Sequence, residues 1–136
     1  MSDGIISIPN LADIDSDAPV LPGGQYEFEV VDASLSEPRE DSKYAGTPML
    51  KLQLRPVDGP DEFTGNVFDN ILLTNDLPMA IRKYKQLVLA AGVSFDEAGN
   101  VDVSEFIGKH VGGVVSVKDD ERYGKRNNVR KYIELI

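Results

Sequence analysis

Apolar and polar residues alternate along several short stretches of the chain, which predicts a protein built mainly from β-strands. Tyr26, Phe28 and Val30 alternate with glutamates, and from Val31 onward the apolar positions shift by one residue. Such a shift turns the side chains to the opposite face, and a β-bulge or a sharp bend is the usual way to accommodate it. We therefore expect a long, bent first strand.

Four further stretches predict strands. In "MLKLQLRP" (49–56), three leucines face one way, while Lys51, Gln53 and Arg55 face the other. The polar segment "SEPREDSKYAGTP" separates this second strand from the first and predicts a loop. The remaining strands are expected in "NVFDNILLT" (66–74), "HVGGVVSVKDD" (110–120) and "NVRKYIELI" (128–136).

One helix is expected between the third and fourth strands, within residues 75–92. Its apolar stripe consists of Ile81, Tyr84, Leu87, Val88 and Ala91. Asn75 or Asp76 is a suitable cap, Pro78 suits the first helical turn, and Gly92 favours an end. A short turn is expected in "DVSEFIGK" (102–109).

The predicted order is therefore three strands, one helix and two strands. This is the order of an OB-fold barrel, in which one strand bends to serve both halves of the sheet. A plain five-stranded sheet with one helix on its face has the same order. We expect a mainly β protein, with a five-stranded OB-fold-like barrel in residues 23–136 and one α-helix between strands three and four.

Acidic residues are concentrated at the front of the chain. The net charge is −9, and residues 1–41 contain ten acids and one base, whereas residues 42–136 contain thirteen of each. Residues 1–22 also contain three prolines and little periodicity, which predicts a flexible acidic N-terminal arm. There is no cysteine, no apolar run of membrane-spanning length and no basic start typical of a signal peptide. These features predict a cytoplasmic protein.

One stretch has the opposite charge. "RYGKRNNVRK" (122–131) contains five cations and no acid, around a tyrosine and a glycine. In an OB-fold, ligands lie across strands two and three, between the loop that joins strands one and two and the loop that joins strands four and five. Both loops here, 38–46 and 119–128, have a tyrosine beside cations. Single-stranded nucleic acid requires cations for its phosphates and flat rings for its unstacked bases.

These two loops and the polar face of the second strand give a set of candidate nucleic-acid-binding residues. The candidates for phosphate contacts are Arg39, Lys43, Lys51, Arg55, Arg122, Lys125, Arg126 and Arg130, and those for base stacking are Tyr44 and Tyr123. An ordinary hairpin is the alternative interpretation, because Asp119, Asp120 and Glu121 are able to pair with these cations across the strands.

Four further aromatic residues are expected in the core, whereas Phe68 is ambiguous, because its strand has apolar residues on both faces. The expected core aromatics are Tyr26, Phe28, Phe95 and Phe106.

Nothing in the sequence predicts an enzyme. His110 is the only histidine, no spacing of acids indicates a catalytic pair, and "DIDSDA" (13–18) lacks the glycine and the final acid of a calcium loop. We expect no catalysis, no metal and no cofactor, and a structural role for His110 at the start of a strand.

Six stretches together resemble a known family: "LPGGQYEFEVVDA", "GTPMLKLQLRPVDGP", "GNVFDNI", "LVLAAGV", "FIGKHVGGVVSVK" and "YGKRNNVRKY", which cover most of residues 21–132. They are similar to short phage-encoded proteins catalogued as a domain of unknown function, some of which are regarded as OB-fold single-stranded DNA-binding proteins. The resemblance implies a phage protein of the host cytoplasm with a role in replication or recombination. Such DNA-binding proteins often recruit partners through an acidic tail, and here the acidic segment is at the front.

Two functions follow as hypotheses. The first is sequence-tolerant binding of single-stranded DNA without catalysis, with phage replication or recombination proteins recruited through residues 1–22. The alternative is a protein-interaction or structural phage component that uses the acidic arm as a docking peptide. A DNA mimic is a weaker third idea, because residues 42–136 are balanced in charge. A homo-oligomer is compatible with each of them.

Overall fold

The computed structural model describes residues 4–13, 20–60, 63, 65–120 and 124–135. Its strands are β1 (Gly24–Ser36), β2 (Met49–Pro56), β3 (Val67–Leu72), β4 (His110–Asp120) and β5 (Gly124–Ile133). Its helices are α1 (Pro78–Ala91) and two 3-10 turns, η1 (Leu11–Asp13) and η2 (Val103–Phe106). The predicted order of three strands, one helix and two strands is confirmed.

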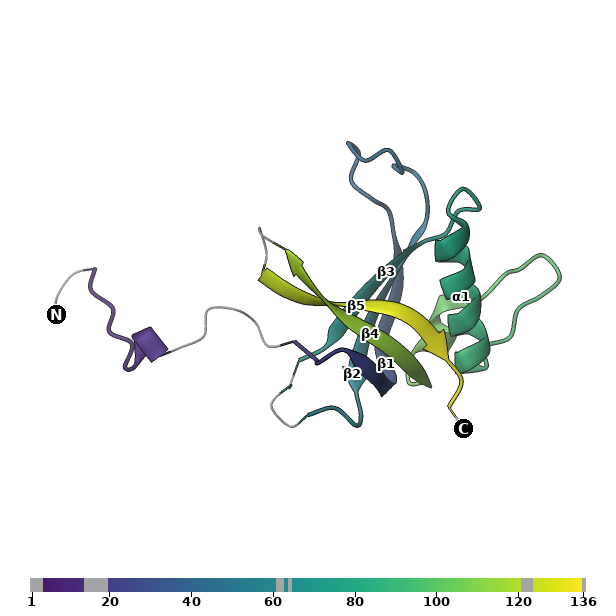
Figure 1. Cartoon of the computed structure of the whole chain (residues 1–136). Helices are drawn as coiled ribbons and strands as arrows, with labels where there is room; N and C mark the ends of the chain where they lie inside the picture. The colour runs from purple at the N-terminus through teal and green to yellow at the C-terminus, as the bar shows by residue number, and fades with distance from the viewer. Residues whose placement is uncertain (1–3, 14–19, 61–62, 64, 121–123, 136) are drawn as a thin grey trace.

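The five strands form one antiparallel sheet in the order β3-β2-β1-β4-β5 (Figure 1). β1 serves two partners, because its first half pairs with β4 and its second half pairs with β2. The register shifts between Val30 and Asp32, where the sequence predicts a bulge. Beside this bulge, Val30 exchanges backbone hydrogen bonds with Gly108 and Lys109, at 2.7 and 2.9 Å. The long, bent first strand is therefore confirmed.

The sheet is not closed into a barrel. Its two edge strands, β3 and β5, approach each other, but no ladder joins them within the described residues. The mainly β class with a five-stranded sheet and one helix is established, and the barrel expected from the sequence is not confirmed. Helix α1 lies against β3, β4 and β5, where its buried residues Leu87, Val88 and Ala91 complete the core (Figure 1).

Three expectations about single elements are wrong. α1 is preceded by Leu77, which makes no side-chain capping hydrogen bond, rather than capped by Asn75 or Asp76. β5 begins at Gly124, not at residue 128, because the chain returns directly along β4. Phe95 is 47 % exposed rather than buried.

The start of the folded body is held by the core. Leu21 is fully buried, although it falls in the segment that the sequence analysis assigned to the arm. The described part of the arm, residues 4–13, keeps Ile5, Ile6, Ile8 and Leu11 exposed. None of the helices in the described residues is long and apolar enough to cross a membrane.

Candidate nucleic-acid interface

Two adjoining hollows lie between the edge strands β3 and β5. The larger, of about 550 Å³, is bordered by β3 and by the ends of β4 and β5. The smaller, of about 430 Å³, lies between β3, β5 and the beginning of α1. Asn70 and Asn128 border both hollows, so the two hollows adjoin each other. We call the two together the β3–β5 groove.

β3 presents an aromatic ring to this groove. Val67, Asp69 and Ile71 are buried, so that Phe68 and Asn70 between them point outward. Phe68 is 65 % exposed and lines the larger hollow. An exposed ring in a groove offers a flat face on which a base or another ring is able to stack.

Cations from the β4–β5 hairpin face this ring across the larger hollow. Lys118, Lys125 and Arg126 line it, and the strand register places Lys118 directly opposite Arg126. Asp119 lies opposite Lys125, as the hairpin interpretation of the sequence predicts.

A buried polar network fixes the width of the groove. Lys83 on α1 donates to Asp69 on β3 at 2.9 Å, and the Tyr132 hydroxyl on β5 donates to the other carboxylate oxygen at 2.7 Å. Lys83 also donates to the carbonyl of Val129 at 3.3 Å. Burial, together with the negative charge of Asp69, raises the pKa of Tyr132 well above its ordinary value. These side chains tie β3, β5 and α1 together where no backbone ladder does.

The entry of the chain into the sheet forms one wall of the groove. Asn127 on β5 holds the backbone of Leu21, accepting from its N–H at 2.9 Å and donating to its carbonyl at 2.8 Å. Val20, the residue before it, lines the larger hollow. Val20 and Leu21 therefore lie beside the larger hollow of the groove.

The structure brings some of the sequence candidates together. Lys125, Arg126 and Arg130 line the groove, and the first two are strand residues rather than loop residues as the sequence suggested. Lys51 is exposed on β2 and is the register partner of Asn70 on β3, so it lies on the adjoining outward face. Arg122 and Tyr123 lie outside the described residues.

The remaining candidates lie elsewhere. Arg55 forms an ion pair with Glu29 on β1. Arg39, Lys43 and Tyr44 belong to the connection between β1 and β2 and line neither hollow. There, the Lys43 ammonium lies 5.1 Å from the centre of the Tyr44 ring, which is half-buried.

Phe68 and Lys118 line the groove but were not among the binding residues predicted from the sequence. Phe68 is ambiguous from the sequence alone, because Val67, Phe68 and Ile71 place apolar residues on both faces of its strand. Lys118 precedes three acids in "KDDE", so the local sequence does not indicate a basic surface. Only the pairing of β4 with β5 places Lys118 opposite Arg126.

No group of histidine and acidic residues in the described ranges is arranged to hold a metal ion. His110 is the first residue of β4, where the sequence analysis placed it, and its Nδ1 lies 2.7 Å from a carboxylate oxygen of Glu27 on β1.

The fold and the groove thus define a small β-sheet protein with a basic, partly aromatic groove between its edge strands. The profile of DUF669, a family described as a protein of unknown function, matches residues 10–134. The chain belongs to this family. No curated protein matches it significantly.

Proposed function

We propose that the protein binds single-stranded DNA in the β3–β5 groove, tolerates many sequences and performs no catalysis. The observation that carries the proposal is Phe68, a ring 65 % exposed inside a groove that is also lined by Lys118, Lys125 and Arg126. The ring offers a stacking platform and the cations offer phosphate contacts, which is the combination that single-stranded nucleic acid requires.

We also propose that the five strands and α1 have an OB-fold-like arrangement. β1 is bent and shared between β2 and β4, α1 follows β3, and the ends of the sheet approach each other at β3 and β5. OB-folds are partly open five-stranded barrels that bind oligonucleotides over strands two and three and beside the loop between strands four and five. The groove proposed here has that position relative to β3 and the β4–β5 hairpin.

A role in phage replication or recombination stays a prediction that rests on the family resemblance. The contacts proposed for Arg39, Lys43, Tyr44, Arg122 and Tyr123 also stay predictions. If the loop between β1 and β2 closes over bound DNA, its cations and its ring would extend the same surface.

Titration of a fluorescent oligo-dT across a series of salt concentrations tests the proposal. A slope of log affinity against log salt of about −3 is predicted by the four groove cations other than Lys83, which is engaged with Asp69: Lys118, Lys125, Arg126 and Arg130. Phe68→Ala should weaken binding by about 1–3 kcal/mol, because it removes a stacking face. Phe95→Ala is the matched control, since Phe95 is also exposed but lies outside the groove. An equal effect of the two substitutions would contradict the proposed platform.

A protein-interaction role is the second candidate, and one specific observation favours it. Ile5, Ile6, Ile8 and Leu11 are 70 %, 86 %, 51 % and 66 % exposed within a ten-residue segment, which is the character of a docking peptide. Protein that ignores oligo-dT at low salt, and that co-purifies with a phage protein only when residues 1–13 are present, would favour this role over DNA binding.

A further inference from the structure

The smaller hollow of the groove has features that the stacking platform at Phe68 does not use. It lies beyond Asn70 and Asn128, between β3, β5 and the beginning of α1. We propose that this hollow is a second nucleobase subsite, which receives one unstacked base of a strand that also crosses Phe68 and which distinguishes among bases. This inference rests on the proposed function and adds a site and a specificity to it.

The rim of the hollow offers apolar surface to the flat face of a base. Ile71 and Val129 lie beneath the hollow and are 0 % and 2 % exposed, so they support it from the core and present almost no surface of their own to a ligand. Met79, the second residue of α1, stands at the rim with 81 % of its surface exposed. A thioether makes favourable contacts with aromatic rings, and covering this side chain removes apolar surface from water.

Two amides border the entrance. Asn70 and Asn128 line both hollows, and neither side chain has a hydrogen-bond partner among the described residues. Each amide offers both an acceptor and donors, which are the groups that recognise the edges of unstacked bases. A base held here is therefore read at its edge, whereas a base stacked on Phe68 is not.

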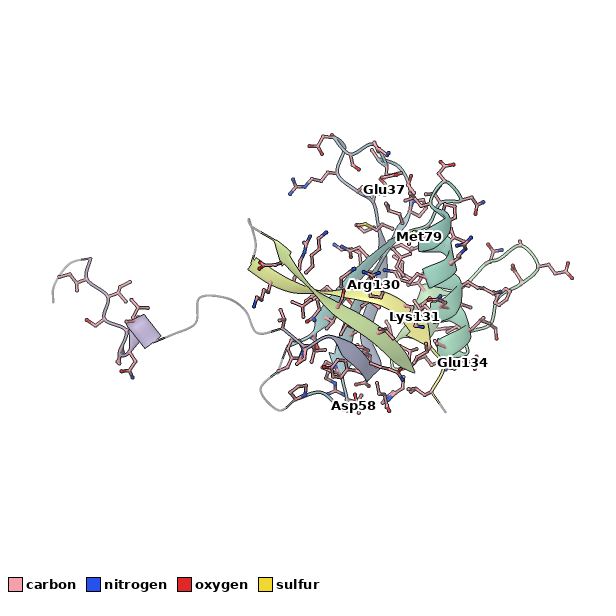
Figure 2. The ribbon with its side chains drawn as sticks, in the orientation of Figure 1. Glu37, Asp58, Met79, Arg130, Lys131 and Glu134 are labelled. Carbon is pink, nitrogen blue, oxygen red and sulfur yellow. The ribbon has the colours of Figure 1, made fainter. Side chains whose placement is uncertain are left out.

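The charges of the hollow suit a phosphate beside that base. Lys83 is already engaged with Asp69 and with the carbonyl of Val129, so Arg130 is the cation available to a ligand. Figure 2 shows Met79 at the beginning of α1 and Arg130 on β5, the two elements between which the hollow lies. Because the two hollows adjoin at Asn70 and Asn128, one strand is able to occupy both.

The length of the bound strand tests the subsite. Affinity for oligo-dT from about 4 to about 16 nucleotides should rise in two steps, as first one hollow and then the other is filled. Met79→Asp should weaken the longer oligonucleotides about tenfold and leave the shortest unchanged, since an acid at the rim repels phosphate. An acid at this position of a helix is compatible with folding, because it faces the positive end of the helix dipole.

The matched control is Leu89→Asp, the same introduced charge at an exposed position on α1 that lines neither hollow. If Leu89→Asp weakens the longer oligonucleotides as much as Met79→Asp does, the effect is general repulsion and the subsite is refuted. If Met79→Asp weakens the affinity for oligo-dT equally at all lengths, the second subsite is refuted as well.

Base discrimination is tested with homopolymers of dT, dC and dA at the longer length. The wild-type protein should prefer one of them by about fivefold, and Asn128→Ala should reduce the difference to within about twofold, in line with the loss of one hydrogen bond. Asn75→Ala, an exposed asparagine outside the groove, should leave the preference unchanged. Equal affinity of the wild-type protein for all three homopolymers would overturn edge reading.

A third measurement separates failure of this inference from failure of the proposed function. Deoxynucleoside monophosphates added to ¹⁵N-labelled protein should shift the amide signals of residues 70, 79 and 128–130. Oligo-dT that binds and perturbs only residues around Phe68 would remove the second subsite and leave the proposed function standing. Absence of any oligonucleotide binding would remove both.

Discussion

At the scale of single residues, Asp69 connects the interior of the protein to the groove. It is the buried charged residue of the described ranges, 6 % exposed, and its neighbours Phe68 and Asn70 face outward. A buried carboxylate is tolerated only where partners satisfy it, and here Lys83 and Tyr132 do so. The residues that hold β3 in place therefore alternate along the strand with the residues proposed to bind DNA.

Tyr132→Phe tests this tie. It leaves one oxygen of Asp69 without its donor, which should lower the free energy of unfolding at neutral pH by about 1–3 kcal/mol. In the folded protein the pKa of Tyr132 is raised, whereas in the unfolded chain it lies near 10, at about its ordinary value. Stability should therefore fall as the pH rises above about 10, and less steeply in the variant.

Urea unfolding at neutral pH and at several alkaline values measures both effects. Tyr44→Phe is the control, because Tyr44 lies in the connection between β1 and β2 and its hydroxyl has no hydrogen-bond partner in the described residues. An alkaline decline as steep in Tyr132→Phe as in the wild-type protein would show that other groups cause it.

Single residues were the least predictable from the sequence. The alternation in β3 was available, but it does not show which face meets a hydrophobic core, so Phe68 stayed ambiguous. The partners of Asp69 come from α1 and β5, 14 and 63 residues further along the chain, and no local pattern specifies such contacts.

At the scale of secondary-structure elements, β4 requires a glycine where it packs closely against β1. A Cβ atom on Gly113 would lie 2.9 Å from an edge carbon of the Phe28 ring, which is fully buried. Glycine at this position therefore lets the Phe28 ring of β1 lie close to the backbone of β4.

Gly113→Ala should lower the free energy of unfolding by about 1–3 kcal/mol, since the added methyl group overpacks a well-filled site. Thermal or urea unfolding measures the loss. In a double-mutant cycle, Phe28→Leu should cost less in the presence of Gly113→Ala than alone, because the smaller side chain makes room for the methyl group. Strict additivity of the two substitutions would argue against this contact as the cause.

Strands were predicted correctly where a local pattern of residues specifies them. Predictions of strand bounds were wrong where the bounds depend on pairing with another strand. β2 was expected at Met49–Pro56 and is found there, because its leucines alternate without interruption. The start of β5 was misplaced because "GKRNN" is polar like a loop, whereas its ladder with Ser116–Asp120 makes it a strand. The bulge in β1 was visible because a shift in apolar phase is itself a local signal.

At the scale of the whole molecule, the net charge is negative, whereas the proposed contact surface is positive. The net charge of −9 is contained in residues 1–41, while the proposed contact surface gathers Lys118, Lys125, Arg126 and Arg130. A nucleic acid at long range meets a negative molecule, and only within roughly a Debye length, about 10 Å at 0.1 M salt, does the local positive charge dominate.

Added salt should raise both the association rate and the dissociation rate, so its effects on long-range approach and on close contact change the affinity in opposite directions. Between about 0.01 M and 0.1 M salt the Debye length shrinks from about 30 to about 10 Å. The association rate with oligo-dT should therefore rise, because long-range repulsion is screened, while the dissociation rate also rises as phosphate contacts weaken. Stopped-flow fluorescence separates the two rates.

Neutralising Asp13, Asp15 and Asp17 to asparagine should raise the association rate at low salt and leave the dissociation rate unchanged. At high salt the substitutions should have little effect on either rate. An association rate that falls steadily with added salt would mean that the groove attracts DNA from a distance, so that the acidic front of the chain has no influence on the encounter.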